Sequence, residues 1–235
     1  RYASCGHKWH GLSLLDFALL AEAAYFDPDF SDLDQVVNTL FDPLDKAKTK
    51  LFKVSVPPTE MRSSHTAQFF DAYSKELNVS VICIRGTDVG RLSDLVEDVK
   101  IFKEPVLISM LRVVFPTIRI WPDKVSAFVI HSLSHSMTLF GLSSNANYYK
   151  GILDYVKSIK GRNIVLTGHS LGGGLARIVS SMEHYPTVTF SPPGVAQSYY
   201  KFAYMENKRN TEKSSFLHHE SIAVLPENDP VTVVD

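Results

Sequence analysis

The chain of 235 residues is poor in cysteine and nearly balanced in charge. Its two cysteines are too few for a small scaffold held together by disulfides. With 24 basic and 25 acidic residues, the formal net charge is -1, so no long-range positive field would attract nucleic acid. An uninterrupted apolar run of about 20 residues, as a transmembrane helix requires, is also missing. These absences disfavour disulfide-rich modules and nucleic-acid-binding proteins.

The cysteines do not decide in which cellular compartment the protein works. Cys83 lies inside an apolar run and is expected to be a small buried side chain, whereas Cys5 could pair with a cysteine outside this chain. The sequence Asn78-Val79-Ser80 is an N-glycosylation signal, which favours a secreted or organelle-lumenal protein.

The composition predicts one folded domain. Apolar residues make up 45% of the chain, with 14 Phe and 10 Tyr, which is enough for a full-sized core. The length fits a single domain over residues 1–235. The chain starts at Arg1 without methionine and stops in a strand-like run at 231–235, so we expect that it is truncated at its C-terminus.

The spacing of apolar residues predicts strands that alternate with helices. Helices are expected at 12–25, 33–41, 148–159 and 175–183, and strands at 51–56, 67–73, 79–85, 163–167, 187–190 and 221–225. This order predicts an α/β fold with a mostly parallel central sheet flanked by helices.

The motif Gly168-His169-Ser170-Leu171-Gly172 joins the strand at 163–167 to a helix of small residues. A strand that turns at once into a helix is crowded, and glycines two residues before and after the serine remove the Cβ atoms that would collide. We interpret the motif as a nucleophile elbow, with His169 directed away from the nucleophile. The alternative is a tight turn with a passive serine.

A serine nucleophile needs a base within hydrogen-bond reach and an acid that orients the base. Asp229 is the best candidate for the acid because it follows the apolar strand at 221–225, at the edge where a parallel sheet delivers catalytic groups. It could instead be an ordinary turn aspartate before Pro230. Glu227 and Asp235 are weaker candidates.

The chain resembles the class 3 lipases, which are triacylglycerol lipases with an α/β-hydrolase fold. The end of the opening helix, Ala23-Ala24-Tyr25, is similar to the family. The four blocks that carry the resemblance, in the family's order, are Ile84-Arg85-Gly86-Thr87, Gly168-His169-Ser170-Leu171-Gly172-Gly173, Thr189-Phe190-Ser191-Pro192-Pro193-Gly194 and Asn228-Asp229-Pro230-Val231.

The resemblance implies a role for each matching residue. Ser170 would be the nucleophile and Asp229 the acid, while Thr87 and the backbone N–H of Leu171 would bind the oxyanion. Gly168, His169 and Gly172 would support the turn. Ester cleavage by this route needs no metal and no organic cofactor.

The sequence departs from the family in two places. No histidine follows Asp229, although the family's catalytic histidine does, so we expect the base in chain beyond residue 235. The region 99–121 is a candidate lid insertion whose apolar block Val106–Phe115 could equally be a buried core helix. Further on, Val129–Leu133 lacks the glycine of the family's corresponding block.

The sequence therefore predicts a serine ester hydrolase that forms an acyl-enzyme with an acyl-lipid substrate, at a membrane or lipid-droplet surface. A phospholipase, galactolipase or thioesterase could use the same turn. From a different class, an inactive pseudo-lipase could bind lipid or protein without catalysis. A histidine in the natural sequence after Asp235 would separate enzyme from pseudo-lipase.

Overall fold

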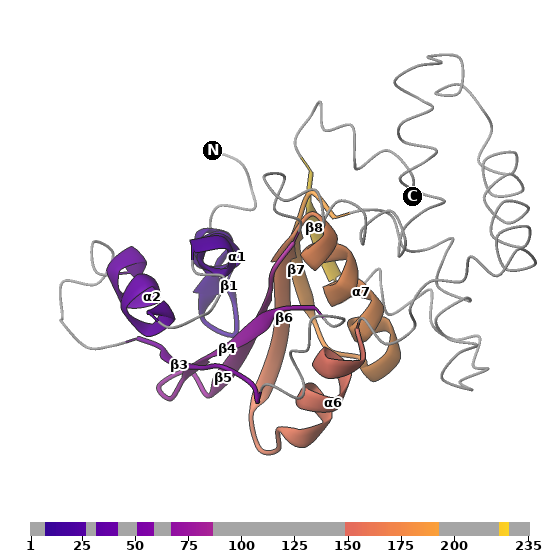
Figure 1. Cartoon of the computed structure of the whole chain (residues 1–235), viewed down its shortest axis with the longest axis horizontal. Coiled ribbons are helices and arrows are strands. Elements are labelled where there is room, and N and C mark those ends of the chain that lie inside the picture. The colour runs from indigo at the N-terminus through magenta and orange to yellow at the C-terminus, as the bar shows by residue number, and fades with distance from the viewer. Residues whose placement is uncertain are drawn as a thin grey trace, which may run out of the picture.

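A computed structural model of the chain describes residues 8–26, 32–41, 51–58, 67–86, 149–192 and 221–225. Six strands in this part of the chain form one sheet in which spatial order equals chain order (Figure 1). The strands are β3 (Lys53–Ser55), β4 (Phe69–Ser74), β5 (Val79–Ile84), β6 (Asn163–His169), β7 (Thr187–Phe190) and β8 (Ser221–Val224).

The sheet is mixed, with its parallel part last. Strands β3, β4 and β5 are antiparallel neighbours, whereas β5, β6, β7 and β8 run parallel to one another. In register, Ile84 of β5 lies opposite Gly168 of β6, and His169 lies opposite Phe190 of β7. The carboxyl ends of β5, β6 and β7 therefore share one edge, which is where open α/β sheets place their sites.

Helices cover both faces of the sheet (Figure 1). α1 (Leu14–Phe26) and α2 (Leu33–Phe41) pack on one face, and α6 (Lys150–Ser158) and α7 (Leu171–Glu183) pack on the other. All residues of β5 are buried because it is central: alternate side chains enter the two cores. The predicted α/β class, with a mostly parallel sheet flanked by helices, is confirmed.

The first helix begins two residues later than predicted. Leu12 and Ser13 form β2, which pairs with β1 (Lys8–Trp9) in a short hairpin turned by His10 and Gly11 at positive φ. The side chains and backbone of Ser13 and Asp16 then bond to each other in a reciprocal cap, which starts α1.

Most other predicted elements are present with small shifts at their ends. α2 and β7 have the predicted bounds. Cys83 is a free, buried cysteine in β5, as predicted. α7 begins at Leu171 rather than at 175, because its glycines belong to the helix itself. None of the helices described is both long and apolar enough to cross a bilayer. The candidate lid at 99–121 and Val129–Leu133 lie outside the described residues.

Candidate active site

Ser170 forms the sharp turn between β6 and α7. The strand ends at His169, the helix begins at Leu171, and Ser170 has φ 52° and ψ -125°. A non-glycine residue with positive φ is strained and persists only when its surroundings hold it there. The backbone holds it on both sides: Ser170 N–H donates to Phe190 O at 2.9 Å, and Gly174 N–H donates to Ser170 O at 3.1 Å.

The hydroxyl of Ser170 is not used to cap the helix. Serine at an N-cap ordinarily has an extended backbone and accepts a hydrogen bond from an N–H of the first turn. Here the backbone angles are those of neither a strand nor a helix, and Ser170 makes no side-chain cap hydrogen bond. Ser170 is half-buried at the edge of the sheet, and its hydroxyl does not cap the helix.

Glycines allow the strand, turn and helix to pack at backbone distance. A Cβ on Gly168 would lie 2.6 Å from the carbonyl carbon of Gly172 and 2.8 Å from Ile84 O. A Cβ on Gly172 would collide with Ile84 O and lie 2.9 Å from the carbonyl carbon of Arg85. Any side chain at either position would force the backbone segments apart.

The first N–H groups of α7 lie beside the serine. Leu171 is the first residue of the helix, and an α-helix leaves its first N–H groups without intrahelical partners at the positive end of its dipole. The end of β5 packs against the same turn, since a Cβ on Gly86 would lie 3.4 Å from Gly172 N. Thr87, the predicted second donor, comes directly after Gly86 in the sequence and lies outside the described residues.

His169 carries an exposed ring that is bound to α1 rather than to the serine. Tyr25 Oη lies 3.1 Å from His169 Nδ1 and 3.4 Å from His169 O. The two rings meet edge to face, with centroids 5.9 Å apart and an interplanar angle of 66°. In the sequence, Tyr25 was noted only because the end of the opening helix is similar to the lipase family. The spacing of residues around Tyr25 did not show that its side chain reaches the serine turn.

Arg85 braces the end of β5. Its Nη1 donates to Gln68 Oε1 at 3.1 Å, and its backbone N–H donates to Gln68 O at 3.0 Å. Asp229, the predicted acid, lies outside the described residues. The structure therefore describes Ser170, Leu171 and the glycines beside them. It does not describe Thr87 or Asp229, the other two predicted site residues.

A second polar cluster lies deeper on the α6 and α7 face of the sheet, and sequence analysis did not find it. Asp71 of β4 is fully buried, and its Oδ2 accepts from Tyr155 Oη at 3.1 Å, Ser80 Oγ at 3.4 Å and Arg162 Nη1 at 3.5 Å. Burial raises the pKa of Asp71 above 3.8, against the opposing effect of these partners. Burial and the nearby carboxylate raise the pKa of Tyr155 to about 12.

Register separates this cluster from the serine. Asp71 lies opposite Ile82, and Ile82 lies opposite Leu166, which is four residues before Ser170 on β6. At the rise of a strand, four residues span about 13 Å. Asp71 is therefore not within reach of the Ser170 hydroxyl.

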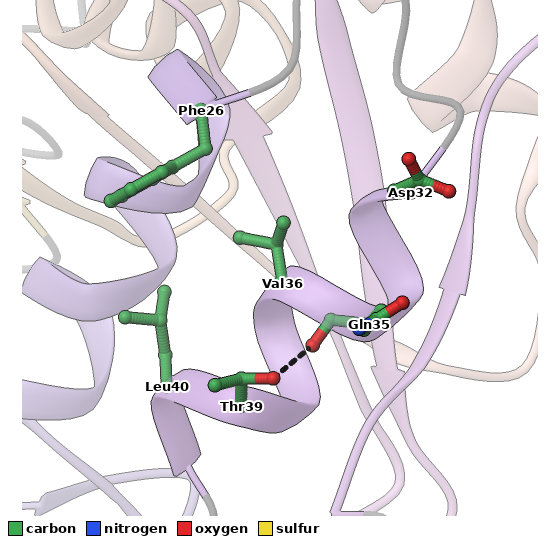
Figure 2. Close-up of a pocket in the computed structure, with 6 residues that line it drawn as sticks. All are labelled: Phe26, Asp32, Gln35, Val36, Thr39 and Leu40. Atoms are coloured by element: carbon green, nitrogen blue, oxygen red, sulfur yellow. Dashed lines mark hydrogen bonds between the residues drawn. The ribbon is translucent and has the colours of Figure 1, made fainter.

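A surface hollow of about 330 Å³ lies between the end of α1 and α2 (Figure 2). Phe26, Val36 and Leu40 supply its apolar wall. Asp32, Gln35 and Thr39 supply the polar remainder, and Thr39 Oγ1 donates to Gln35 O at 2.8 Å. No residue of the serine turn lines this hollow, so it is separate from the candidate active site.

The family model described as Lipase (class 3) matches residues 81–234, which is well over half of the chain. The chain belongs to the class 3 lipase family. The match includes the end of β5, the serine turn and the strands that follow it, so this lipase has an α/β-hydrolase fold and is a lipase-like ester hydrolase by family.

Solved structures of lipases are similar to this class 3 lipase. M37 lipase is 15% identical, with 94% of this chain and 68% of that chain covered at a TM-score of 0.41. Lip2 lipase from Yarrowia lipolytica is 16% identical, with 89% and 68% covered at a TM-score of 0.34. No curated protein matches the lipase in sequence.

Proposed function

We propose that this class 3 lipase is a serine ester hydrolase that cleaves acyl lipids with Ser170 as its nucleophile. The Ser170 oxygen attacks the ester carbonyl, the alcohol leaves with a proton, and water then hydrolyses the acyl-enzyme to release the fatty acid and regenerate the serine. The observation that carries the proposal is the backbone of Ser170, with φ 52° and ψ -125° between a buried strand and a helix.

Two features support this role. Strain at a residue is expected where the surrounding structure holds a reactive group in place. The N–H of Leu171 also lies at the start of α7, where a developing oxyanion would meet the positive end of a helix dipole. We propose Thr87 as the second oxyanion donor, because Gly86 brings the end of β5 against this turn. One such donor contributes roughly 3–4 kcal/mol to transition-state stabilisation.

For the remaining triad we propose Asp229 as the acid and a histidine as the base. The matched family region includes Asp229. None of the histidines in the sequence follows Asp229, so we propose that the base is supplied by chain after residue 235. We further propose a single domain, with 99–121 as its lid and a lipid surface as the place where it acts.

The test is esterase activity of the full-length protein on p-nitrophenyl butyrate. Ser170→Ala should lower kcat by on the order of 10⁴-fold or more, because no other group can form the acyl-enzyme. Ser158→Ala is the matched control: Ser158 is an exposed serine whose hydroxyl donates to Tyr155 O at the end of α6. Turnover that survives in Ser170→Ala would rule out this nucleophile.

A panel of substrates separates the related functions. Triacylglycerol, phospholipid, galactolipid and acyl thioester offered to the same protein would rank the lipid class. Fluorophosphonate labelling checks the alternative of an inactive binding module. A full-length protein that hydrolyses no ester and takes no label at Ser170 would support that module instead.

A further inference from the structure

The peptide bond between His169 and Ser170 is contacted at both ends by other elements. Its N–H, on Ser170, donates to Phe190 O of β7 at 2.9 Å. Its C=O, on His169, accepts from the hydroxyl of Tyr25 on α1 at 3.4 Å. A peptide group that is bonded on both sides cannot rotate freely about its neighbouring torsions, and the next torsion along the chain is φ of Ser170.

The ring of His169 gives the Tyr25 hydroxyl a second bond. Tyr25 Oη is 3.1 Å from His169 Nδ1. Both contacts are satisfied together when Nδ1 carries a proton and donates to Tyr25 Oη, while Tyr25 donates its own proton to His169 O. The Tyr25 hydroxyl then bonds to both the side chain and the backbone carbonyl of His169, the residue before Ser170.

The end of β5 lies against the same hydroxyl. A Cβ on Gly86 would collide both with Tyr25 Oη and with His169 O. α1, the end of β5 and the end of β6 therefore meet at one point, although Tyr25 and His169 are 144 residues apart in the chain. Tyr25 occupies a position between the serine turn and the segment that leads to Thr87.

We propose that Tyr25 is a positioning residue: its hydroxyl binds the carbonyl of His169 and so holds the strained backbone of Ser170. Tyr25 does not touch the reacting atoms and acts through the peptide. Its effect on turnover rests on the proposed function, whereas its effect on the backbone does not.

The experiment compares Tyr25→Phe with the unsubstituted full-length protein in two measurements. Phenylalanine keeps the ring and removes only the hydroxyl. On p-nitrophenyl butyrate, kcat should fall about 10-fold because a less firmly held turn places the Ser170 oxygen less accurately for attack, while KM stays within about two-fold. Amide hydrogen exchange measured on peptides that contain Ser170 should become about 10-fold faster at this amide.

Tyr185→Phe is the matched control. Tyr185 is half-buried after the end of α7 and packs against the core, so the variant loses a phenolic hydroxyl away from the serine turn. It should leave kcat and the exchange of Ser170 unchanged. Equal changes in both variants would overturn the proposal, because they would then reflect a general loss of stability.

The two measurements keep this proposal separate from the proposed function. Unchanged exchange at Ser170 in Tyr25→Phe would overturn the positioning role, even in an active esterase. Absence of Ser170-dependent hydrolysis would overturn the esterase, and the exchange result would still decide whether Tyr25 holds the backbone. Faster exchange with unchanged kcat would also overturn the positioning role, since the held geometry would not matter for turnover.

Discussion

The serine turn and the Asp71 cluster place polar groups on the same sheet by opposite means. At the carboxyl edge, Ser170 is held by backbone hydrogen bonds and by glycines that let strand and helix touch. In the interior, Asp71 is held by the side chains of Tyr155, Ser80 and Arg162. The serine turn leaves Ser170 half-buried at the sheet edge, whereas the Asp71 cluster encloses its carboxyl fully.

The serine turn and the Asp71 cluster should therefore be sensitive to different substitutions. The serine turn requires side chains to be absent at Gly168 and Gly172, so adding even one methyl group should damage it. The Asp71 cluster requires side chains to be present, and its buried carboxyl already has one oxygen, Oδ1, without a hydrogen-bond partner. Its weakness should therefore appear when the charge on the carboxyl changes rather than when volume is added.

The largest effect should come from Gly172→Ala. The new Cβ would meet Ile84 O and the carbonyl carbon of Arg85, which are backbone atoms that cannot rotate away. We expect a loss of about 3 kcal/mol in the free energy of unfolding, measured by urea denaturation, together with loss of esterase activity.

Gly161→Ala is the control for this prediction. Gly161 has φ +74°, but its Cβ would find no atom within 4 Å. The substitution should therefore cost only the strain of a left-handed residue, about 1 kcal/mol. If Gly161→Ala cost as much as Gly172→Ala, close packing would not be what distinguishes the serine turn.

The next largest effect should be a difference in the free energy of unfolding between Ser170→Gly and Ser170→Ala. Both variants lose the hydroxyl and therefore activity, but glycine adopts the positive φ of 52° without strain. Ser170→Gly should be more stable than Ser170→Ala by about 1–2 kcal/mol in the free energy of unfolding. Equal stability of the two variants would show that the turn stores little strain.

The smallest effect should be the pH dependence that Asp71 contributes. Its pKa in the folded protein is raised above the usual 3.8 by burial, so the folded state retains the proton when the unfolded chain has lost it. Stability is therefore greatest with the carboxyl protonated and falls as pH rises from about 3.8 to the raised pKa. The slope cannot exceed about 1.4 kcal/mol per pH unit for one group.

The measurement is urea denaturation of Asp71→Asn and the unsubstituted protein over a series of pH values. The free energy of unfolding of the unsubstituted protein, minus that of the variant, should decrease as pH rises through this window and then become constant. Asp154→Asn, at an exposed carboxylate on α6, is the control. A difference for Asp71→Asn that grows with pH would contradict the raised pKa.

The sequence predicted the regular elements of the fold well because their signals are local. α2 and β7 have apolar residues at clear helical or strand spacing and bounds that the structure repeats. The short hairpin at residues 8–13 was missed, since two-residue strands have no periodicity. The start of α7 was placed too late because glycine has poor intrinsic helix propensity, which close packing overrides here.

The candidate site was only partly predictable. The pattern around Ser170 predicted the strand, the turn and the two glycines because their spacing follows from local crowding. Tyr25 could not be found in this way, since its partner lies on β6 and depends on how α1 crosses the sheet. Asp71 was likewise missed, because an acid in a strand shows its burial only when α6 and its neighbours are in place.

The sequential strand order has a consequence for folding kinetics. β4 and β5 are joined by a short turn and can pair early, whereas β5 and β6 are parallel and far apart in the chain. Parallel pairs of large sequence separation form slowly because closing a long loop costs entropy before any contact is gained. We expect β5–β6 pairing to limit the folding rate. The serine turn, which also needs Phe190 of β7, would be among the last parts of the molecule to acquire its native geometry.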